Sequence, residues 1–225
     1  MRKISAKHLT EVIKREVIAA NLQLGDDMIE ALRRARNIEE SEVGKEILDK
    51  LLENAELASA NRIPICQDTG LVVIFAELGQ EVCIVDGDFT EAIEEGVRVG
   101  YQEGYLRKSV CHPFTRENTG DNTPVIIHLD MVPGDRLRLW VVPKGGGSEN
   151  MSALYMLPPS AGWNGVKEKV VETVVRAGPN PCPPTIVGVG IGGNFEKCAI
   201  LAKKALLRPV SEPNPVVELQ AMEVE

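Results

Sequence analysis

Hydrophobic positions recur at helical spacing through the first sixty residues of the chain. In residues 5–22, aliphatic side chains follow one another at mixed three- and four-residue intervals, which predicts an amphipathic helix. Gly25 interrupts this pattern, and two aspartates then begin a second predicted helix over residues 26–37. Ser41 is a candidate N-cap for a third helix that extends to about residue 60. We therefore expect a helical N-terminal region over residues 1–62.

After Pro64 the pattern changes to short runs rich in Val and Ile, separated by turn residues. The predicted strands cover residues 71–78, 81–87, 124–132, 135–143 and 185–193, and the predicted helices cover residues 89–106, 163–177 and 194–207. The sequence thus predicts a mixed α/β fold, in which the helical N-terminal region leads into an α/β core with short strands. We place this core at residues 63–208, followed by a proline-containing, acidic tail at residues 209–225.

Composition and charge exclude several classes of protein. The chain has 225 residues and a net charge of −8, so no basic excess is available for a nucleic-acid backbone. It contains no run of about 18 apolar residues and no apolar signal region at its N-terminus, so we expect a cytoplasmic protein without a membrane span. Five cysteines are an odd number, which favours reduced thiols or metal ligands over a disulfide framework.

The first segment with candidate chemistry is IPICQDTG, residues 63–70. The Cys66 thiolate is a soft ligand suited to iron–sulfur or zinc, Gln67 offers an amide, and the Asp68 carboxylate could transfer a proton nearby. The alternative is a loop that contains a buried cysteine, since a free cysteine often behaves as a small hydrophobic residue.

Two further segments could bind an anion. In KGGGSENMS, consecutive glycines that include Gly146 and Gly147 let backbone N–H groups converge into a nest, although a flexible turn is the alternative. The terminal Gly-Lys-Ser/Thr of a P-loop is absent. In LRKSV, Arg107 and Lys108 could clamp a carboxylate, Arg by two parallel hydrogen bonds.

The loop before residue 185 contains a second candidate metal ligand. Cys182 lies between prolines, which hold a backbone rigid and so could fix a thiolate at a set position. The glycines of residues 188–193 lack the spacing of the dinucleotide fingerprint, so we interpret them as a close-packed turn between a strand and a helix. Nucleotide binding is the alternative. Cys83, Cys111 and Cys198 are read as structural.

Taken in order, these segments resemble the α subunit, or N-terminal domain, of the class I fumarate hydratase and L-tartrate dehydratase family. The resemblance covers nearly the whole chain through the motifs PICQDTG, LRKSV, NTGDNTP, VVPKGGGSEN, PCPP and VGVGIGGNFEKCAILAKKALLRP. It implies a [4Fe–4S] cluster held by three cysteines, a hydro-lyase activity, and a β subunit that supplies the catalytic base.

The resemblance also implies roles for individual residues. Cys66 and Cys182 match two cluster ligands, and Gln67 with Asp68 matches the pair that handles substrate and proton. Arg107 and the backbone of Gly146 and Gly147 match contacts to the substrate carboxylates.

The family's third cluster cysteine belongs to a segment beyond the last matching motif, so we expect a chain that lacks its C-terminal segment. We further expect an isolated chain without an intact cluster and without activity, a homo- or hetero-oligomeric enzyme, and a role in the tricarboxylic acid cycle as fumarate hydratase. The alternatives are an L-tartrate dehydratase α subunit and, from another class, a non-catalytic anion- or nucleotide-binding module.

Overall fold

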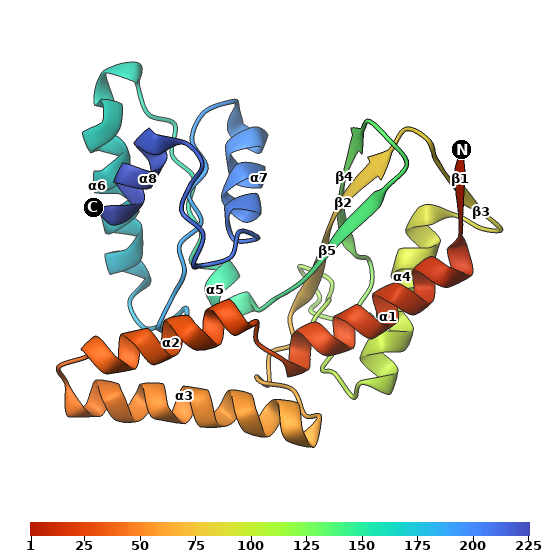
Figure 1. The fold of residues 1–225 in the computed structure, drawn as a ribbon, viewed down its shortest axis with the longest axis horizontal. Coiled ribbons are helices and arrows are strands. Elements are labelled where there is room, and N and C mark those ends of the chain that lie inside the picture. The colour runs from red at the N-terminus through yellow and green to blue at the C-terminus, as the bar shows by residue number, and fades with distance from the viewer. The chain divides into compact units, whose positions relative to one another are not determined.

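The computed structural model describes all of residues 1–225 and has a mixed α/β fold, which confirms the predicted fold class (Figure 1). Contacts group the chain into two units, residues 1–23 with 54–149 and residues 24–53 with 150–225. The predicted domain boundaries after residues 62 and 208 stay predictions. In chain order the elements are β1 (Arg2–Ser5), α1 (Ala6–Leu22), α2 (Asp26–Ile38), α3 (Glu42–Asn61), β2 (Leu71–Gly79), β3 (Val82–Val85), α4 (Phe89–Glu103), β4 (Ile126–Val132), β5 (Leu137–Lys144), α5 (Gly146–Glu149), the 3₁₀ turn Pro159–Ala161, α6 (Gly162–Ala177), α7 (Phe195–Ala205) and α8 (Val217–Val224).

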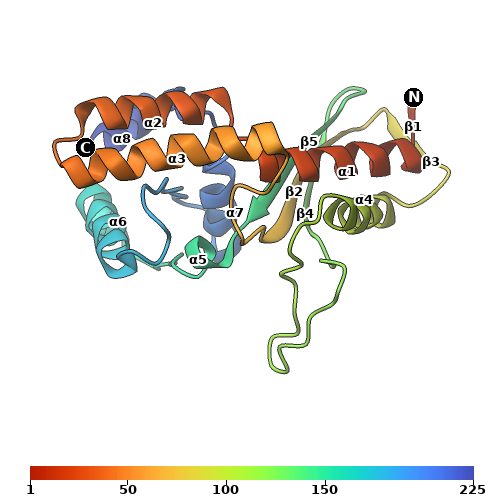
Figure 2. The same cartoon turned by 90° about the horizontal axis from the view of Figure 1, so that it is seen from below.

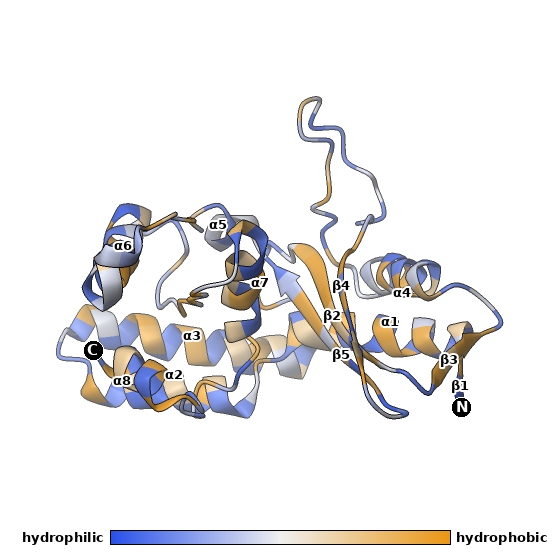
Figure 3. Cartoon of the chain, turned by 90° about the horizontal axis from the view of Figure 1, so that it is seen from above, coloured by the Kyte–Doolittle hydropathy of each residue, from blue (hydrophilic) through white to orange (hydrophobic).

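The first unit is built on a three-stranded sheet in the order β4–β2–β5. β2 pairs parallel to β4 and antiparallel to β5, with Phe75 opposite His128 on one side and Trp140 on the other. Residues 72–76 of β2 are all buried, as befits the central strand of the sheet, and Figure 3 colours most of this strand as hydrophobic. The turn at Pro133–Gly134 therefore connects two strands that are not paired with each other, because β2 lies between them.

Helices α1 and α4 lie side by side and form the core of this unit with the sheet (Figure 2). Ile13 and Val17 of α1 are fully buried, as are Ile93 and Val97 of α4. The helices approach closely at Gly100, where a Cβ atom would lie only 2.3 Å from Val17 Cγ1. This packing confirms the helical spacing predicted for residues 5–22 and 89–106.

The first strand was not predicted. Residues 2–5 form β1, which pairs parallel to β3 with Ile4 opposite Ile84. A four-residue strand directly before a helix has too short a pattern to be separated from the helix by spacing alone. Its partner β3 is distant in sequence, so the pairing is a tertiary effect.

The second unit is mainly helical and contains α2, α6, α7, α8 and the first part of α3. Within it, the Arg36 guanidinium donates to both carboxylate oxygens of Asp49, at 2.9 and 3.1 Å. The helices predicted from Ser41 to about residue 60, over residues 163–177 and over residues 194–207 are confirmed as α3, α6 and α7. Ser41 Oγ accepts the Gly44 N–H as the predicted cap of α3. No described helix has the length and apolar character that crossing a bilayer requires.

The prediction of a strand at residues 185–193 is wrong. The segment forms no ladder and instead packs against α7, where a Cβ atom at Gly188 would lie 2.2 Å from Ala202 O. At Gly190 a Cβ atom would lie 2.0 Å from Cys198 O. The glycines therefore serve close contact with a helix, and the segment has no neighbouring strand to pair with.

Candidate active site

The CQDT loop (Cys66–Thr69) precedes β2 and is anchored on its N-terminal side. Ile65 donates its N–H to Asn21 O, and its carbonyl accepts from Asn54 Nδ2, both at 2.9 Å. Cys66 and Gln67 are exposed, and the Cys66 thiol donates to Gln67 Oε1 at 3.4 Å. The loop thus presents a free thiol and an amide at the surface of a fixed backbone.

The Asp68 carboxylate connects this loop to two other segments. Its Oδ1 accepts from the Gly70 N–H at 3.1 Å and from Ser109 Oγ at 3.3 Å. Its Oδ2 accepts from the Gly146 N–H at 2.8 Å. Through these three donors, one partly buried carboxylate holds the CQDT loop, LRKSV and the glycine segment together.

The glycine segment forms the turn that its composition predicts, but its N–H at Gly146 is already occupied. Residues 146–149 make up the single helical turn α5, and a Cβ atom at Gly145 would lie only 3.3 Å from Asp68 Oδ2. Lys144 Nζ donates to Ser148 Oγ at 2.5 Å and pairs with Glu149 at 3.6 Å. Gly147 is exposed and remains the predicted substrate contact without an internal acceptor.

Arg107 is brought to the same place through its backbone. Its carbonyl accepts from Thr69 Oγ1 at 2.6 Å, whereas its exposed guanidinium has no ion-pair partner in the protein. The structure therefore places a free cationic side chain on a segment that is tied to the CQDT loop.

Sequence reasoning missed two buried polar residues beneath these loops. The Tyr101 hydroxyl donates to Thr69 O at 2.6 Å and also contacts Gly70 O at 3.1 Å. Asn122 binds Gly70 O, Ser109 N and Val110 N. Tyr101 occupies the apolar face of α4 and Asn122 stands among turn formers, so neither position stands out by local pattern.

Two pKa values near the site depart from their ordinary range. Burial raises the pKa of Tyr101 to about 12, so its phenol stays protonated. Burial also raises the pKa of the Asp121 carboxyl, but hydrogen bonds from Thr123 and Arg98 outweigh it and bring that pKa to about 2. Asp121 and Asn118 shape this loop, because their side chains accept the Thr123 and Gly120 N–H groups.

Cys182 lies in the second unit, in the loop between α6 and α7, and its thiol is free and exposed. Its backbone is in the left-handed region (φ 58°), and its N–H donates to Pro179 O at 3.0 Å. Cys83 and Cys198 are half-buried in β3 and α7, and Cys111 forms an isolated bridge with Asn118. No three or more His, Cys, Asp or Glu side chains gather as a metal-binding group.

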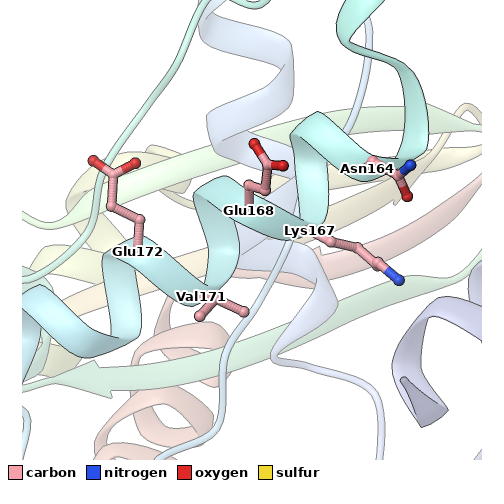
Figure 4. Close-up of a pocket in the computed structure, with 5 residues that line it drawn as sticks. All are labelled: Asn164, Lys167, Glu168, Val171 and Glu172. Atoms are coloured by element: carbon pink, nitrogen blue, oxygen red, sulfur yellow. The ribbon is translucent and has the colours of Figure 1, made fainter.

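One surface depression, of about 490 Å³, lies along α6 (Figure 4). Its lining residues all project from this single helix, namely Asn164, Lys167, Glu168, Val171 and Glu172. It includes none of the predicted site residues and carries charges of both signs, so it gives no competing candidate site.

Comparison with known proteins agrees with the motifs. The family model described as fumarate hydratase (Fumerase) matches residues 10–225. A putative L(+)-tartrate dehydratase subunit alpha from Methanocaldococcus jannaschii is 40% identical over 223 residues, covering 96% of this chain and 78% of the relative. The L(+)-tartrate dehydratase subunit alpha of Escherichia coli strain K12 is 31% identical over 213 residues, covering 92% and 70%. The chain therefore belongs to the fumarate hydratase (Fumerase) family, as the sequence motifs predicted.

Proposed function

We propose that this chain is the α subunit of an iron–sulfur hydro-lyase that removes water from L-tartrate. The relatives named above are tartrate dehydratase α subunits, so they favour the alternative over fumarate hydration, which was our main expectation from the sequence. A role in the tricarboxylic acid cycle loses its support with that change. Fumarate remains the second candidate substrate because the matching family model carries its name.

The observation that carries the proposal is the linkage made by Asp68. Its carboxylate fixes the exposed Cys66 and Gln67 beside the segments of Ser109 and Gly146. A dicarboxylate substrate needs fixed donors and a cation at set distances, because catalysis depends on orientation. In our proposal the Arg107 guanidinium and the Gly147 N–H bind carboxylates, and the Gln67 amide orients the substrate. The Gly146 N–H, predicted as a further carboxylate contact, donates to Asp68 instead and holds the glycine segment in place.

Proton transfer is assigned to Asp68 and to a base from the partner subunit. The Asp68 carboxylate lies between the CQDT loop, Ser109 and Gly146, next to the proposed substrate contacts, where a carboxylate can take up a proton. Its hydrogen bonds also make Asp68 a structural tie, so its substitution should affect both the loops and the chemistry.

The two predicted cluster ligands of this chain are of the right chemical type for a [4Fe–4S] cluster, but the cluster needs a third. Cys66 and Cys182 are exposed free thiols, the donors that such clusters use, but a cluster with one open iron takes three. We therefore assign the cluster to the assembled enzyme and derive no reaction step through it from these residues.

A β subunit is the proposed partner. The named relatives are alpha subunits, and the second unit exposes a run of apolar side chains of the kind that partner proteins cover. These exposed residues are Ile186, Val187, Val189, Ile191 and Phe195.

Anaerobic co-expression with a β subunit tests the assignment. The purified complex is assayed for release of water from L-tartrate and for hydration of fumarate. We expect kcat/KM to be at least about tenfold higher on L-tartrate, a difference of about 1.4 kcal/mol in transition-state binding. A preference for fumarate would reverse the substrate assignment, and turnover of neither would remove the hydro-lyase proposal.

A further inference from the structure

Asn122 is the one fully buried amide beneath the candidate active site. It is 0% exposed and precedes Pro124 by two residues in the motif NTGDNTP. Its backbone is in the left-handed region (φ 64°), which Asn tolerates better than most residues. A buried polar side chain is costly unless its hydrogen bonds are made, so its partners indicate its role.

Three hydrogen bonds connect the Asn122 side chain to the two loops of the site. Its Nδ2 donates to Gly70 O at 3.2 Å. Its Oδ1 accepts from Ser109 N at 2.6 Å and from Val110 N at 3.1 Å. One planar amide therefore links the end of the CQDT loop to the segment that follows Arg107.

This amide bridge complements a second link between the same loops. Thr69 Oγ1 donates to Arg107 O at 2.6 Å, and the Tyr101 hydroxyl holds Thr69 O from below at 2.6 Å. The backbone at Arg107 is thus held by two hydrogen bonds, one at its own carbonyl from Thr69 and one at Ser109 N, two residues further on, to Asn122. Its exposed guanidinium has no other partner that would fix the direction in which it extends.

We propose that Asn122 is a positioning residue, whose buried amide sets the placement of Arg107 relative to the Cys66–Asp68 loop and thereby controls binding of the substrate carboxylate. The inference rests on the proposed function for the identity of that substrate. It adds a residue that never touches substrate and acts only through the backbones of Gly70, Ser109 and Val110.

The test uses the enzyme assembled with its β subunit. Asn122→Asp keeps the shape and both acceptor contacts but puts an oxygen opposite Gly70 O, so the bridge loses its donor. Asn122→Gly accepts the left-handed backbone and removes the bridge entirely, and it replaces the aspartate variant if that one fails to fold. The matched control is Thr10→Val, which removes a partly buried hydrogen bond of 3.0 Å to Ala92 O that joins α1 to α4.

Two readouts separate positioning from general stability. For Asn122→Asp we expect KM for L-tartrate to rise by about tenfold or more while kcat changes by less than about threefold. We also expect faster backbone hydrogen exchange in residues 107–112. Thr10→Val should leave both unchanged.

An unchanged KM in both Asn122 variants would overturn the proposal. So would a loss of folding in both of them, because Asn122 would then support the fold as a whole. If the wild-type complex turns over neither substrate, the proposed function is refuted. The hydrogen-exchange data then still test whether Asn122 positions residues 107–112. Faster exchange confined to residues 107–112 would support the tether, and unchanged exchange there would refute it.

Discussion

The Asp68 carboxylate and the Gly146 N–H are joined by a hydrogen bond of 2.8 Å across 78 positions of sequence. The glycine segment thus uses one of its converging N–H groups for an anion that belongs to the chain itself. This contact fixes the CQDT loop at the end of β5, where the predicted substrate contacts lie. The loops of the candidate site are therefore held together by the chain's own contacts.

Asp68→Asn should weaken the fold, because an amide has one acceptor oxygen where the carboxylate has two. The amide NH2 group of the asparagine would face the N–H of either Gly70 or Gly146, and that hydrogen bond would be lost. We expect the free energy of unfolding to fall by about 1 to 3 kcal/mol, measured by denaturant titration. Asp135→Asn, at an exposed carboxylate, is the control and should change stability by less than about 0.5 kcal/mol. An equal change in the free energy of unfolding of the two variants would contradict the linking role of Asp68.

Tyr101 predicts a specific loss of stability at alkaline pH. Its pKa is raised from 10.0 to about 12 in the folded chain, so the folded state holds this proton more tightly than the unfolded state does. The resulting contribution is present in full below about pH 10 and is lost as the pH rises toward 12, by about 3 kcal/mol. Unfolding titrations at several pH values should show this loss in the wild type and not in Tyr101→Phe. Parallel curves for the two proteins would refute the burial argument.

Much of the fold was predicted from sequence because it rests on local spacing. The helices over residues 6–22, 26–38 and 162–177 follow apolar periodicity and clear end signals, and their bounds agree with prediction within one or two residues. The strand expected at residues 185–193 failed because a run of Val and Ile predicts an extended segment without supplying its neighbour. Gly188 and Gly190 instead lie so close to α7 that a Cβ atom at either position would clash with its backbone.

For the candidate site, the sequence predicts chemical groups but not the hydrogen bonds that connect them, and the roles of those groups stay predictions. Cys66, Asp68 and Arg107 stood out as chemical groups in unusual local sequence. The roles of Tyr101 and Asn122 depend on Gly70, 31 and 52 positions away respectively. Such contacts follow from how α4 and the loops pack, which no local pattern encodes.

Arg107→Lys should weaken substrate binding without unfolding the chain. A lysine keeps the charge but loses the two parallel hydrogen bonds that a guanidinium makes to a carboxylate. In the assembled enzyme we expect KM for L-tartrate to rise by about tenfold with little change in melting temperature, because the side chain has no internal partner. Arg33→Lys, at an exposed position on α2, provides the control. A KM equal to that of the wild type would remove Arg107 from the binding set.

Residues 1–225 alone should hold no intact cluster and show no turnover. Two thiolates leave a cubane short of protein ligands, and the proposed base belongs to the β subunit. Anaerobic reconstitution of the isolated chain, followed by iron and sulfide analysis, checks this against the assembled complex treated identically. A stoichiometric cluster on the isolated chain would show that the ligand assignment is wrong.

The most direct test of the account is the behaviour of Cys66→Ser in the assembled enzyme. Cluster absorbance and L-tartrate dehydration are measured on the same anaerobic samples, with Cys83→Ser as the control because that half-buried thiol in β3 has no assigned role. We predict that Cys66→Ser loses absorbance and turnover together, while Cys83→Ser keeps both. Full turnover in Cys66→Ser would contradict the central claim that the CQDT loop carries the α subunit's half of a hydro-lyase site.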